Sequence, residues 1–440
     1  MEPQWIALLM VMAFFALLLV GIPVATTLAV VGFVFGWIGF GETLFNLLPA
    51  RLFGIVAGYQ WMAIPLFVFM GVMLEKSRLA DDLLDVIGLA AGGIRGGMGV
   101  GIILFGVLMG ATTGIVGATV ITLGLLTLPT LIRRGYDKGI ACGAICASGT
   151  LGQIIPPSLI LILLSDIMQL SVGTLFAAAV MPGLLLAALY IAYLLLRGAL
   201  APSLMPPIPV EERMRVSRGE LLGRFWRVVV PPVLLVVCVL GAIVGGVAAP
   251  TEAASMGAVG SVLVALGARR LSMKVLGQVA LETSRITAIM MLILMAAQVF
   301  ALSFRGLQGE DLITRMFDLI PGGVNSDIWF MMLLIFVLGF FIEWIEISYI
   351  AVPLFMPVLL KQGVDPVWLA MLITVNLQSS FLTPPFGWSL FYLKGVAPPE
   401  VSITDIYRGV VPFIVLQGLG LVLVFLFPEI ALWLPRVIGW

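Results

Sequence analysis

The 440-residue chain contains no histidine. This absence excludes imidazole general bases, imidazole metal ligands and histidine-linked proton relays. Cysteine is scarce too, since only Cys142, Cys146 and Cys238 occur, in apolar surroundings without flanking metal ligands. Charged residues make up 10% of the chain, against about a quarter in soluble domains, and the net charge is zero. We therefore expect neither an ordinary soluble protein nor one that attracts nucleic acid.

Hydrophobic residues, by contrast, make up 61% of the chain. Apolar runs long enough to cross a bilayer recur from end to end, for instance at 5–20 and 410–427. Backbone groups inside a bilayer must be satisfied internally, which helices achieve. The sequence therefore predicts an all-α polytopic membrane protein. The first four residues contain no Lys or Arg, so we expect the run at 5–20 to be the first span of the mature protein and not a signal peptide.

The chain contains an internal repeat. The proline pair Pro156-Pro157 recurs as Pro384-Pro385, each inside a long apolar segment. We call the difference in numbering between the two pairs the repeat offset. At the same offset Pro129, Gly135 and Asp137 recur as Pro357, Gly363 and Asp365. A proline pair removes two amide donors and clashes with the preceding turn, so it breaks a helix. Two broken membrane helices at corresponding places in two halves are typical of a secondary transporter and mark its binding site.

The distribution of Lys and Arg sets the orientation, because these residues favour the cytoplasmic side. Placing the N-terminus outside leaves only five of the 23 Lys and Arg residues outside, namely Arg51, Arg305, Arg315, Lys361 and Arg436. Both termini are then outside, and the two halves come out in opposite orientations. We expect residues 1–200 to form the first inverted repeat, 201–227 an Arg-rich cytoplasmic linker, and 228–440 the second inverted repeat.

Each repeat is expected to hold several simple spans, one re-entrant hairpin and one broken helix. In the first repeat the simple spans are placed near 5–21, 24–40, 52–75 and 172–196, the hairpin at 97–133 and the broken helix at 139–170. In the second repeat the simple spans are placed near 228–246, 251–268, 283–303 and 409–432, the hairpin at 328–360 and the broken helix at 366–393.

Both breaks carry hydroxyl and amide side chains, since residues 147–158 read ASGTLGQIIPPS and residues 376–387 read NLQSSFLTPPFG. Carbonyl oxygens freed at a break suit a hard cation such as sodium when hydroxyl or amide oxygens lie beside them. Half-helix N-termini suit an anion. For any single Ser or Thr, the alternative is a hydrogen bond within the bundle. We assign substrate binding, or the break itself, to Thr119, Gly152, Pro156, Pro157, Ser158, Glu343, Ser380, Pro384, Pro385 and Gly387.

Two carboxylates lie near the expected tip of the second hairpin, Glu343 and Glu346 on either side of Trp344. A charged carboxylate at the middle of a bilayer costs about 3 kcal/mol, so these side chains should face a cavity or a partner. The alternative is a tip close to the membrane surface, where water solvates them. Glu252, at the start of the span near 251–268, is expected to cap that helix.

These motifs carry a family resemblance across essentially the whole chain. The most specific pieces are SGTLG at 148–152, IPPS at 155–158, APTEA at 249–253 and LTPPFG at 382–387. They resemble the large membrane subunit of the TRAP transporters (tripartite ATP-independent periplasmic transporters), within the ion transporter superfamily of elevator carriers. The first hairpin tip is similar to the Ser/Gly-rich tip of this family, but it has Thr where Ser is common.

The resemblance implies an elevator-type transporter in a bacterial inner membrane, with both termini periplasmic. A sodium gradient, without ATP or another cofactor, would drive uptake of an organic acid (a dicarboxylate, a 2-oxo acid or a related carboxylate). The acidic second tip makes sialic acid a less expected substrate. The implied partners are a periplasmic binding protein and a small four-span membrane subunit on a separate chain. The implied sodium ligands are Thr112, Thr113, Gly114, Ser148, Gly149, Thr150, Glu346, Ser348, Asn376, Gln378, Ser379 and Thr383.

Three alternatives stay open at this point. A stand-alone sodium-coupled anion carrier of the same superfamily would share the fold and differ only in its partners. An intramembrane enzyme is disfavoured, because the chain has neither a His-Glu-x-x-His zinc motif nor a Gly-x-Ser-x-Gly nucleophile elbow with a triad partner. A channel is disfavoured as well, since a continuous pore requires no broken helices in antiparallel repeats.

Overall fold

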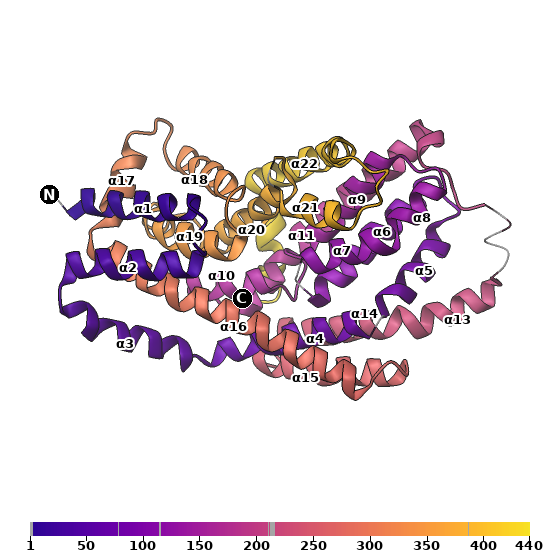
Figure 1. The fold of residues 1–440 in the computed structure, drawn as a ribbon, viewed down its shortest axis with the longest axis horizontal. Coiled ribbons are helices and arrows are strands. Elements are labelled where there is room, and N and C mark those ends of the chain that lie inside the picture. Colours follow the sequence, from indigo (N-terminus) through magenta and orange to yellow (C-terminus); the bar gives the residue numbers. More distant parts are fainter. Residues whose placement is uncertain (1–2, 78, 114–115, 210, 212–215, 386) are drawn as a thin grey trace.

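The computed structural model describes residues 3–77, 79–113, 116–209, 211, 216–385 and 387–440 (Figure 1). All the regular elements within these ranges are helices, which confirms the predicted all-α class. Six described helices are long and apolar enough to cross a membrane. Large apolar side chains such as Phe53, Val237 and Leu292 are more than half exposed on the helix surfaces. A lipid bilayer would solvate such side chains, whereas water would not.

The helices follow one another in the order in which the spans were expected. The first half comprises α1 (Pro3–Leu19), α2 (Val24–Phe40), α3 (Thr43–Val56), the short 3-10 helix η1 (Tyr59–Met62), α4 (Ala63–Lys76), α5 (Leu79–Ala91), α6 (Gly97–Thr113), α7 (Val116–Leu126), α8 (Leu128–Arg133), α9 (Lys138–Leu151), α10 (Leu159–Ile167) and α11 (Val172–Leu200). The second half comprises α14 (Val230–Val244), α15 (Pro250–Gly267), α16 (Met273–Gly306), α17 (Gly309–Asp318), α18 (Val324–Leu338), α19 (Trp344–Lys361), α20 (Pro366–Leu382), α21 (Trp388–Val396), α22 (Ile403–Leu426) and α23 (Glu429–Val437).

Four helices recur along the chain with almost constant spacing, and in the first half the short α8 lies among them. The repeat offset carries the first residues of α7 and α9 onto the first residues of α19 and α20. It carries the starts of α6 and α10 to positions adjacent to the starts of α18 and α21. We call α6 to α8 the first hairpin and α18–α19 the second hairpin. The pairs α9–α10 and α20–α21 are the first and second broken helices. The order of helices in the structure thus follows the spacing of the proline pairs in the sequence.

The repeated Gly and Asp residues have the same local role in both halves. Gly135 and Gly363 adopt φ values of 80° and 87°, which glycine tolerates best, and each ends the second arm of a hairpin. Asp137 then accepts a 2.9 Å hydrogen bond from the amide of Ile140 at the start of α9. Asp365 accepts hydrogen bonds, also of 2.9 Å, from two amides at the start of α20. Both carboxylates satisfy amides that have no partner in the helix.

Both proline pairs interrupt a helix as expected, and both Pro-Pro peptide bonds are cis. The helix α9 ends at Leu151 and α10 begins at Leu159, whereas α20 ends at Leu382 and α21 begins at Trp388. Proline offers no amide to the preceding turn, so the carbonyls of that turn lose their helical partners. Serine hydroxyls replace two of these donors: Ser158 donates to the carbonyl of Gln153, and Ser389 donates to the carbonyl of Phe381.

Some local boundaries differ from the expectation. The single span placed near 52–75 is divided, because α3 ends at Val56 and α4 begins only at Ala63. Gly58 lies at this corner, where a Cβ atom would come within 2.7 Å of the Trp61 ring. Within the linker, η2 (Pro202–Leu204) and α13 (Arg218–Val228) are helical. The Ser217 hydroxyl caps α13 by accepting from the amide of Glu220 at 3.1 Å. The cap expected of Glu252 is confirmed, since its carboxylate accepts from the amide of Ala249 at 2.9 Å.

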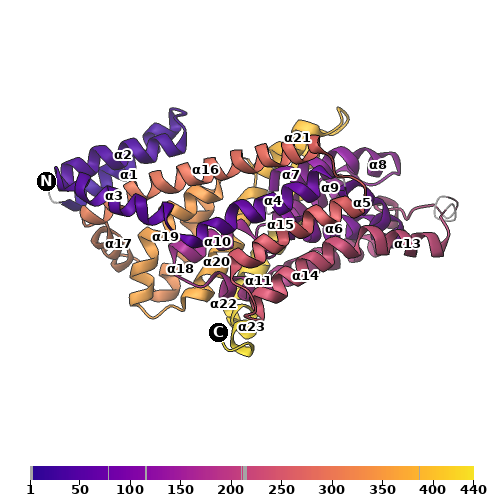
Figure 2. The same cartoon turned by 90° about the horizontal axis from the view of Figure 1, so that it is seen from below.

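The helices fall into two packed groups. In one, the 34-residue helix α16 lies against α2 and α4, and α15 packs between α4 and α14. Figure 2 shows α16 crossing much of the molecule with α4 and α15 alongside. Gly32 permits the close approach of α2 to α16, because a Cβ there would lie 2.8 Å from the amide nitrogen of Phe300. In the other group, α9 packs against α6, α7 and α22, and α20 packs against α18, α22 and α11.

Candidate functional site

A cavity of about 400 Å³ lies where the two groups of helices meet at the hairpin tips. The first hairpin contributes residues at the start of α7, and the second contributes residues at the start of α19. The helices α4 and α16 form the opposite wall, and α10, α20 and α21 contribute one residue each. The cavity therefore joins both repeats, although the two hairpins lie in different halves of the sequence.

Three helices begin at this cavity, since Val116, Leu159 and Trp344 are the first residues of α7, α10 and α19 and all three line it. The first amides of a helix have no carbonyl partner within the helix and carry its positive dipole end. Several such ends around one cavity provide hydrogen-bond donors for an anion. Val116 and Trp344 are related by the repeat offset, so the two repeats contribute equivalent positions.

Charged side chains line the same cavity. Glu343, which the sequence singled out, lies in its wall together with Glu75, Lys76 and Glu282. Lys76 is the one cation among the described lining residues, and its Nζ lies 3.6 Å from Glu75 Oε1. Tyr392 adds a phenol from α21. Of these residues only Glu343 was predicted from the sequence, because charges at the end of a predicted span give no sign of which cavity they face.

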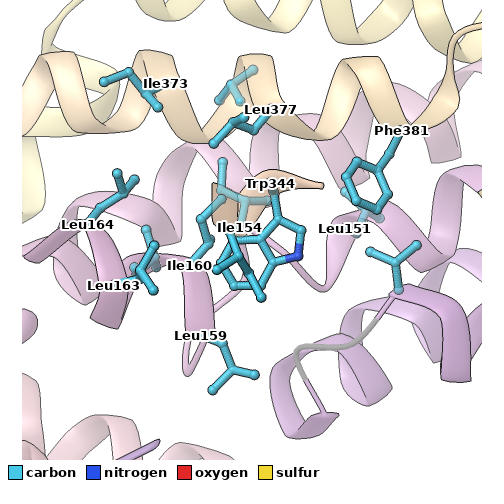
Figure 3. Packing of buried hydrophobic residues seen from close by; sticks show 14 of the residues in the cluster. Leu151, Ile154, Leu159, Ile160, Leu163, Leu164, Trp344, Ile373, Leu377 and Phe381 are labelled. Carbon is cyan, nitrogen blue, oxygen red and sulfur yellow. The ribbon is translucent and has the colours of Figure 1, made fainter. Parts of the chain in front are cut away.

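Trp344 is the buried aromatic residue at the tip of the second hairpin. It is 8% exposed and belongs to the same buried apolar cluster as Ile154, Ile160 and Phe381, and Figure 3 shows its indole beside Ile154 and Ile160. Ile154 and Ile160 flank the first break, whereas Phe381 precedes the second. The sequence predicted no role for Trp344 and drew attention only to the two carboxylates beside it. Trp344, at the start of the second hairpin's α19, thus shares a buried apolar cluster with residues beside both breaks.

The polar residues of the first break are buried at the end of α9. Ser148 and Thr150 donate their hydroxyl protons to the carbonyls of Ile145 and Ala147, at 3.0 and 2.9 Å. Thr150 Oγ1 also accepts a 3.2 Å hydrogen bond from Gln417 Nε2 on α22. Pro156 and Pro157 form the break, and Ser158 precedes the first residue of α10. Thr119 is buried on the neighbouring helix α7.

The polar residues of the second break are arranged in the same way on α20. Ser379, Ser380 and Thr383 donate to the carbonyls of Asn376, Leu377 and Ser379 at 2.6, 2.8 and 2.7 Å. Asn376 Nδ2 donates to the carbonyl of Met332 on α18 at 2.6 Å. After Pro384 and Pro385, Gly387 caps α21, and a Cβ atom there would lie 2.8 Å from the carbonyl oxygen of Phe381.

The second hairpin brings Glu346 and Ser348 to the same group of helices. Glu346 is 6% exposed, and its Oε2 atom has no hydrogen-bond partner. Ser348 donates to the carbonyl of Trp344 at 2.7 Å. The amides of Gln378 and Gln153 are buried without a partner as well. Gln153 stands within the polar segment at 147–158 but was not among the predicted site residues. Buried polar groups are normally paired, so these atoms are candidates to bind an ion or a water molecule.

The first arm of each hairpin packs closely on a broken helix. A Cβ atom at Gly110 on α6 would collide with the backbone of Gly152, and one at Gly339, directly after α18, would collide with the Ser380 side chain. Gly152 and Ser380 are themselves related by the repeat offset. Gly149 likewise packs against Val120 on α7. The structure thus brings the predicted site residues on α9 and α20 against the hairpins.

Part of the predicted first sodium site cannot be placed. Gly114 lies outside the described residues, and so do the side chains of Thr112 and Thr113.

Comparison with known proteins agrees with this architecture. Residues 11–430 match the family model described as "Tripartite ATP-independent periplasmic transporter, DctM component". A C4-dicarboxylate TRAP transporter large permease protein of Pseudomonas aeruginosa is 31% identical over 89% of this chain and 90% of its own length. An ectoine TRAP transporter large permease protein of Halomonas elongata is 28% identical over 97% of this chain and 98% of its own length.

Among solved structures, the YdaH transporter of Alcanivorax borkumensis superposes with a TM-score of 0.63. Its sequence is 15% identical, and the match covers 98% of each chain, so the likeness concerns the fold. The family match covers nearly the whole sequence. The chain therefore belongs to the tripartite ATP-independent periplasmic (TRAP) transporter family, as a large permease component.

Proposed function

We propose that this permease uses a sodium gradient to take up an organic acid, such as a dicarboxylate or a 2-oxo acid, by an elevator movement. The observation that carries the proposal is the cavity at the hairpin tips, where α7, α10 and α19 begin. The amides in the first turns of these helices can donate hydrogen bonds to a carboxylate, and this requires no mobile charged side chain. Lys76 lies in the same wall and adds one cation. Glu343 lies beside these helix starts and belongs to the substrate or ion site.

The polar ends of α9 and α20 support sodium binding. The hydroxyls of Ser148, Thr150 and Ser379 give their single proton to carbonyls of their own helix, so their lone pairs can accept a cation. Asn376 Nδ2 donates to the backbone carbonyl of Met332, so the side-chain amide oxygen of Asn376 points away from that carbonyl. Hard cations prefer oxygen ligands of this kind. The two sodium sites would lie where the hairpins pack on the broken helices.

The packing suggests which parts move. We infer that both hairpins and both broken helices move as one unit, and that α2, α4, α14, α15 and α16 form the scaffold. The helices α11 and α22 pack against α20 and α9, so they belong to the moving unit and not to the scaffold with the other simple spans. Glu75, Lys76 and Glu282 then lie on the scaffold side of the cavity, and Glu343 lies on the moving side.

The proposed setting is a bacterial inner membrane, with both termini in the periplasm and the segment 201–227 in the cytoplasm. A small four-span subunit on another chain and a periplasmic binding protein complete the transporter. The relative named isethionate TRAP transporter permease protein DctMQ, from Oleidesulfovibrio alaskensis, supports such a pairing, because this chain covers only 62% of its length. A stand-alone sodium-coupled carrier is the alternative, and neighbouring genes for the two partners would argue against it.

Uptake into proteoliposomes tests the proposal. The permease, its small subunit and the binding protein would be supplied with radiolabelled succinate, since the Pseudomonas relative is named for C4-dicarboxylates. An inward sodium gradient should concentrate succinate above its external level, and potassium should not replace sodium. If omitting the binding protein leaves uptake unchanged, the stand-alone carrier is correct. If succinate and a panel of 2-oxo acids and other carboxylates only equilibrate across the membrane, the proposal of sodium-driven uptake is wrong.

A further inference from the structure

A second polar cavity, of about 310 Å³, lies between the two groups of helices. It is lined by the C-terminal part of α16, by the end of α10 and Gln169 after it, by the middle of α19 and by Arg51 on α3. The polar residues in its wall are Arg51, Asp166, Gln169, Gln298, Arg305 and Tyr349. None of these six was a predicted site residue, and the proposed sodium and substrate sites use none of them.

The two cavities lie in series along α16. Residues from Glu282 to Met290 line the first cavity, and residues from Ala297 to Arg305 line the second. Seven positions separate Met290 from Ala297, which is about 10 Å at 1.5 Å per helical residue. Ile293 and Leu294 lie between them and are buried. Packed apolar side chains on α16 thus separate the two cavities.

The repeat relates the two cavities to each other. Val72, Glu75 and Lys76 on α4 line the first cavity, and the repeat offset carries them onto α16, the helix that lines the second cavity, although the equivalent residues themselves do not line it. The same offset carries Ile121, in the wall of the first cavity, to Tyr349 in the wall of the second. If the repeats are inverted, the two cavities open toward opposite faces of the membrane. Arg51 and Arg305 are among the few cations that the charge distribution places outside.

The chemistry of the second cavity suits a carboxylate. Arg51, Gln169 and Arg305 are exposed at its surface, where their side chains offer N–H donors. Tyr349 is 2% exposed, and its hydroxyl has no hydrogen-bond partner although it lines a polar cavity. Asp166 is the only carboxylate among the described lining residues, against two guanidinium groups. The Glu310 carboxylate lies 3.8 Å from Arg305 and 3.9 Å from Lys361. This single negative charge is shared by two cations, so it does not fully neutralise Arg305.

We propose that the cavity formed by Arg51, Arg305, Gln298 and Tyr349 is an anion-binding vestibule on the periplasmic face. It receives a carboxylate-bearing solute before that solute reaches the hairpin tips. The guanidinium groups attract the anion, and the buried Tyr349 hydroxyl donates to it at the floor of the cavity. The first cavity has the opposite balance of charge, with three carboxylates and one lysine in its wall. An anion is therefore attracted at the periplasmic entrance and held less strongly on the cytoplasmic side.

The assignment of the second cavity to the periplasmic face rests on the proposed function. Its preference for anions can be tested without a transport measurement. In a Cys238→Ser background, the other two cysteines are buried. Ala301, which lines the cavity, is changed to cysteine in the purified protein. The rates of its modification by a sulfonatoethyl and by a trimethylammonioethyl methanethiosulfonate are compared. With both arginines present, the ratio of anionic to cationic rate should exceed that of a cysteine at Leu319, an exposed position outside the cavity.

Replacing both arginines by glutamine should lower this ratio about tenfold, since each charge attracts one reagent and repels the other. Arg51→Lys with Arg305→Lys should keep the ratio, which separates charge from misfolding. Arg315→Gln, on the same predicted face but outside the cavity, should leave the ratio at the Ala301 position unchanged. Millimolar succinate should slow modification of the cavity cysteine and not that of the Leu319 position. An unchanged ratio in the double glutamine variant, or an absence of protection by succinate, would overturn the proposal. Either result would leave sodium-driven uptake as a separate question.

Discussion

The backbone carbonyls of Gln153 and Phe381 stand at equivalent positions of the two repeats, and each accepts a hydrogen bond from a serine hydroxyl. The two residues are related by the repeat offset, and the donors are Ser158 and Ser389. Proline takes the place of the residue whose amide would normally reach each carbonyl, because Pro157 and Pro385 lie four positions further on. The serines themselves are not equivalent in the alignment of the repeats. Each repeat therefore replaces the missing amide donor with a serine hydroxyl, but the serine comes from a different position in each repeat.

Removing either serine hydroxyl should destabilise the permease. Ser158→Ala or Ser389→Ala leaves a buried carbonyl without a donor, which costs about 1–3 kcal/mol. We expect both variants to unfold at a lower temperature in detergent or nanodiscs. Ser165→Ala is the matched control, because Ser165 is equally buried and donates to Ile162 at 2.6 Å, within a regular helix. Equal melting temperatures for all three variants would show that the two hydroxyls do not replace the missing donors.

The glycine contacts between hairpins and broken helices should tolerate no side chain. Gly110→Ala or Gly152→Ala places a methyl group against the facing backbone, and overpacking of this kind costs about 1–3 kcal/mol. The hairpin would separate from the broken helix, so sodium-driven uptake should fall together with thermal stability. Gly395→Ala is the control, because nothing lies within 4 Å of a Cβ atom at that helical position. Normal uptake by both test variants would mean that the close approach is not needed.

Much of the fold could be predicted from the sequence, because its strongest signals are local. The proline pairs predict the two interrupted helices, and the repeated Gly and Asp residues end one helix and cap the next. The span placed near 24–40 coincides with α2. The corner at Gly58 was missed because the apolar run continues across it. The helix α16 begins at Met273, well before the span placed near 283–303, because hydropathy detects only the part of a helix that suits a bilayer.

The candidate site could be predicted only in part. Polar residues next to a break are visible in the sequence, but the charged wall of the cavity is assembled from separate helices. Lys76 ends α4, Glu282 lies near the start of α16, and Glu343 precedes α19, so no spacing rule connects them. The apolar cluster that Trp344 shares with residues beside both breaks also depends on contacts between distant segments. Such contacts leave no periodic pattern in the sequence.

The sodium dependence of uptake should test the sodium site that we propose at the second break. Asn376→Ala or Thr383→Ala removes one proposed oxygen ligand, which is worth about 1 kcal/mol and raises the half-saturating sodium concentration about fivefold. Uptake measured over a range of sodium concentrations gives this value. Thr374→Ala on the same helix is the control, because its hydroxyl donates to Ala370 at 2.8 Å and belongs to no proposed site. An unchanged sodium requirement in both test variants, with normal expression, would contradict the placement of this sodium site.

Lys76 should govern the affinity for the anionic substrate. Lys76→Gln removes the one cation among the described residues of the first cavity, so the KM for a carboxylate should rise. Because Lys76 is partly exposed and lies 3.6 Å from Glu75, we expect an effect of about 1 kcal/mol, or about fivefold in KM. Lys76→Arg should preserve the KM, and Lys274→Gln, which removes a cation outside the cavity, should leave it unchanged.

The double variant Glu75→Gln with Lys76→Gln decides how Lys76 acts. If Lys76 contacts the substrate, removing Glu75 as well should not restore the KM, because the cation is still missing. If Lys76 only neutralises Glu75, the double variant should return to the original KM, and direct contact with the substrate is then excluded. Kinetics of succinate uptake at saturating sodium distinguish the two results. The half-saturating sodium concentration should stay constant throughout, because both side chains lie on α4, outside the hairpins and broken helices that carry the proposed sodium ligands.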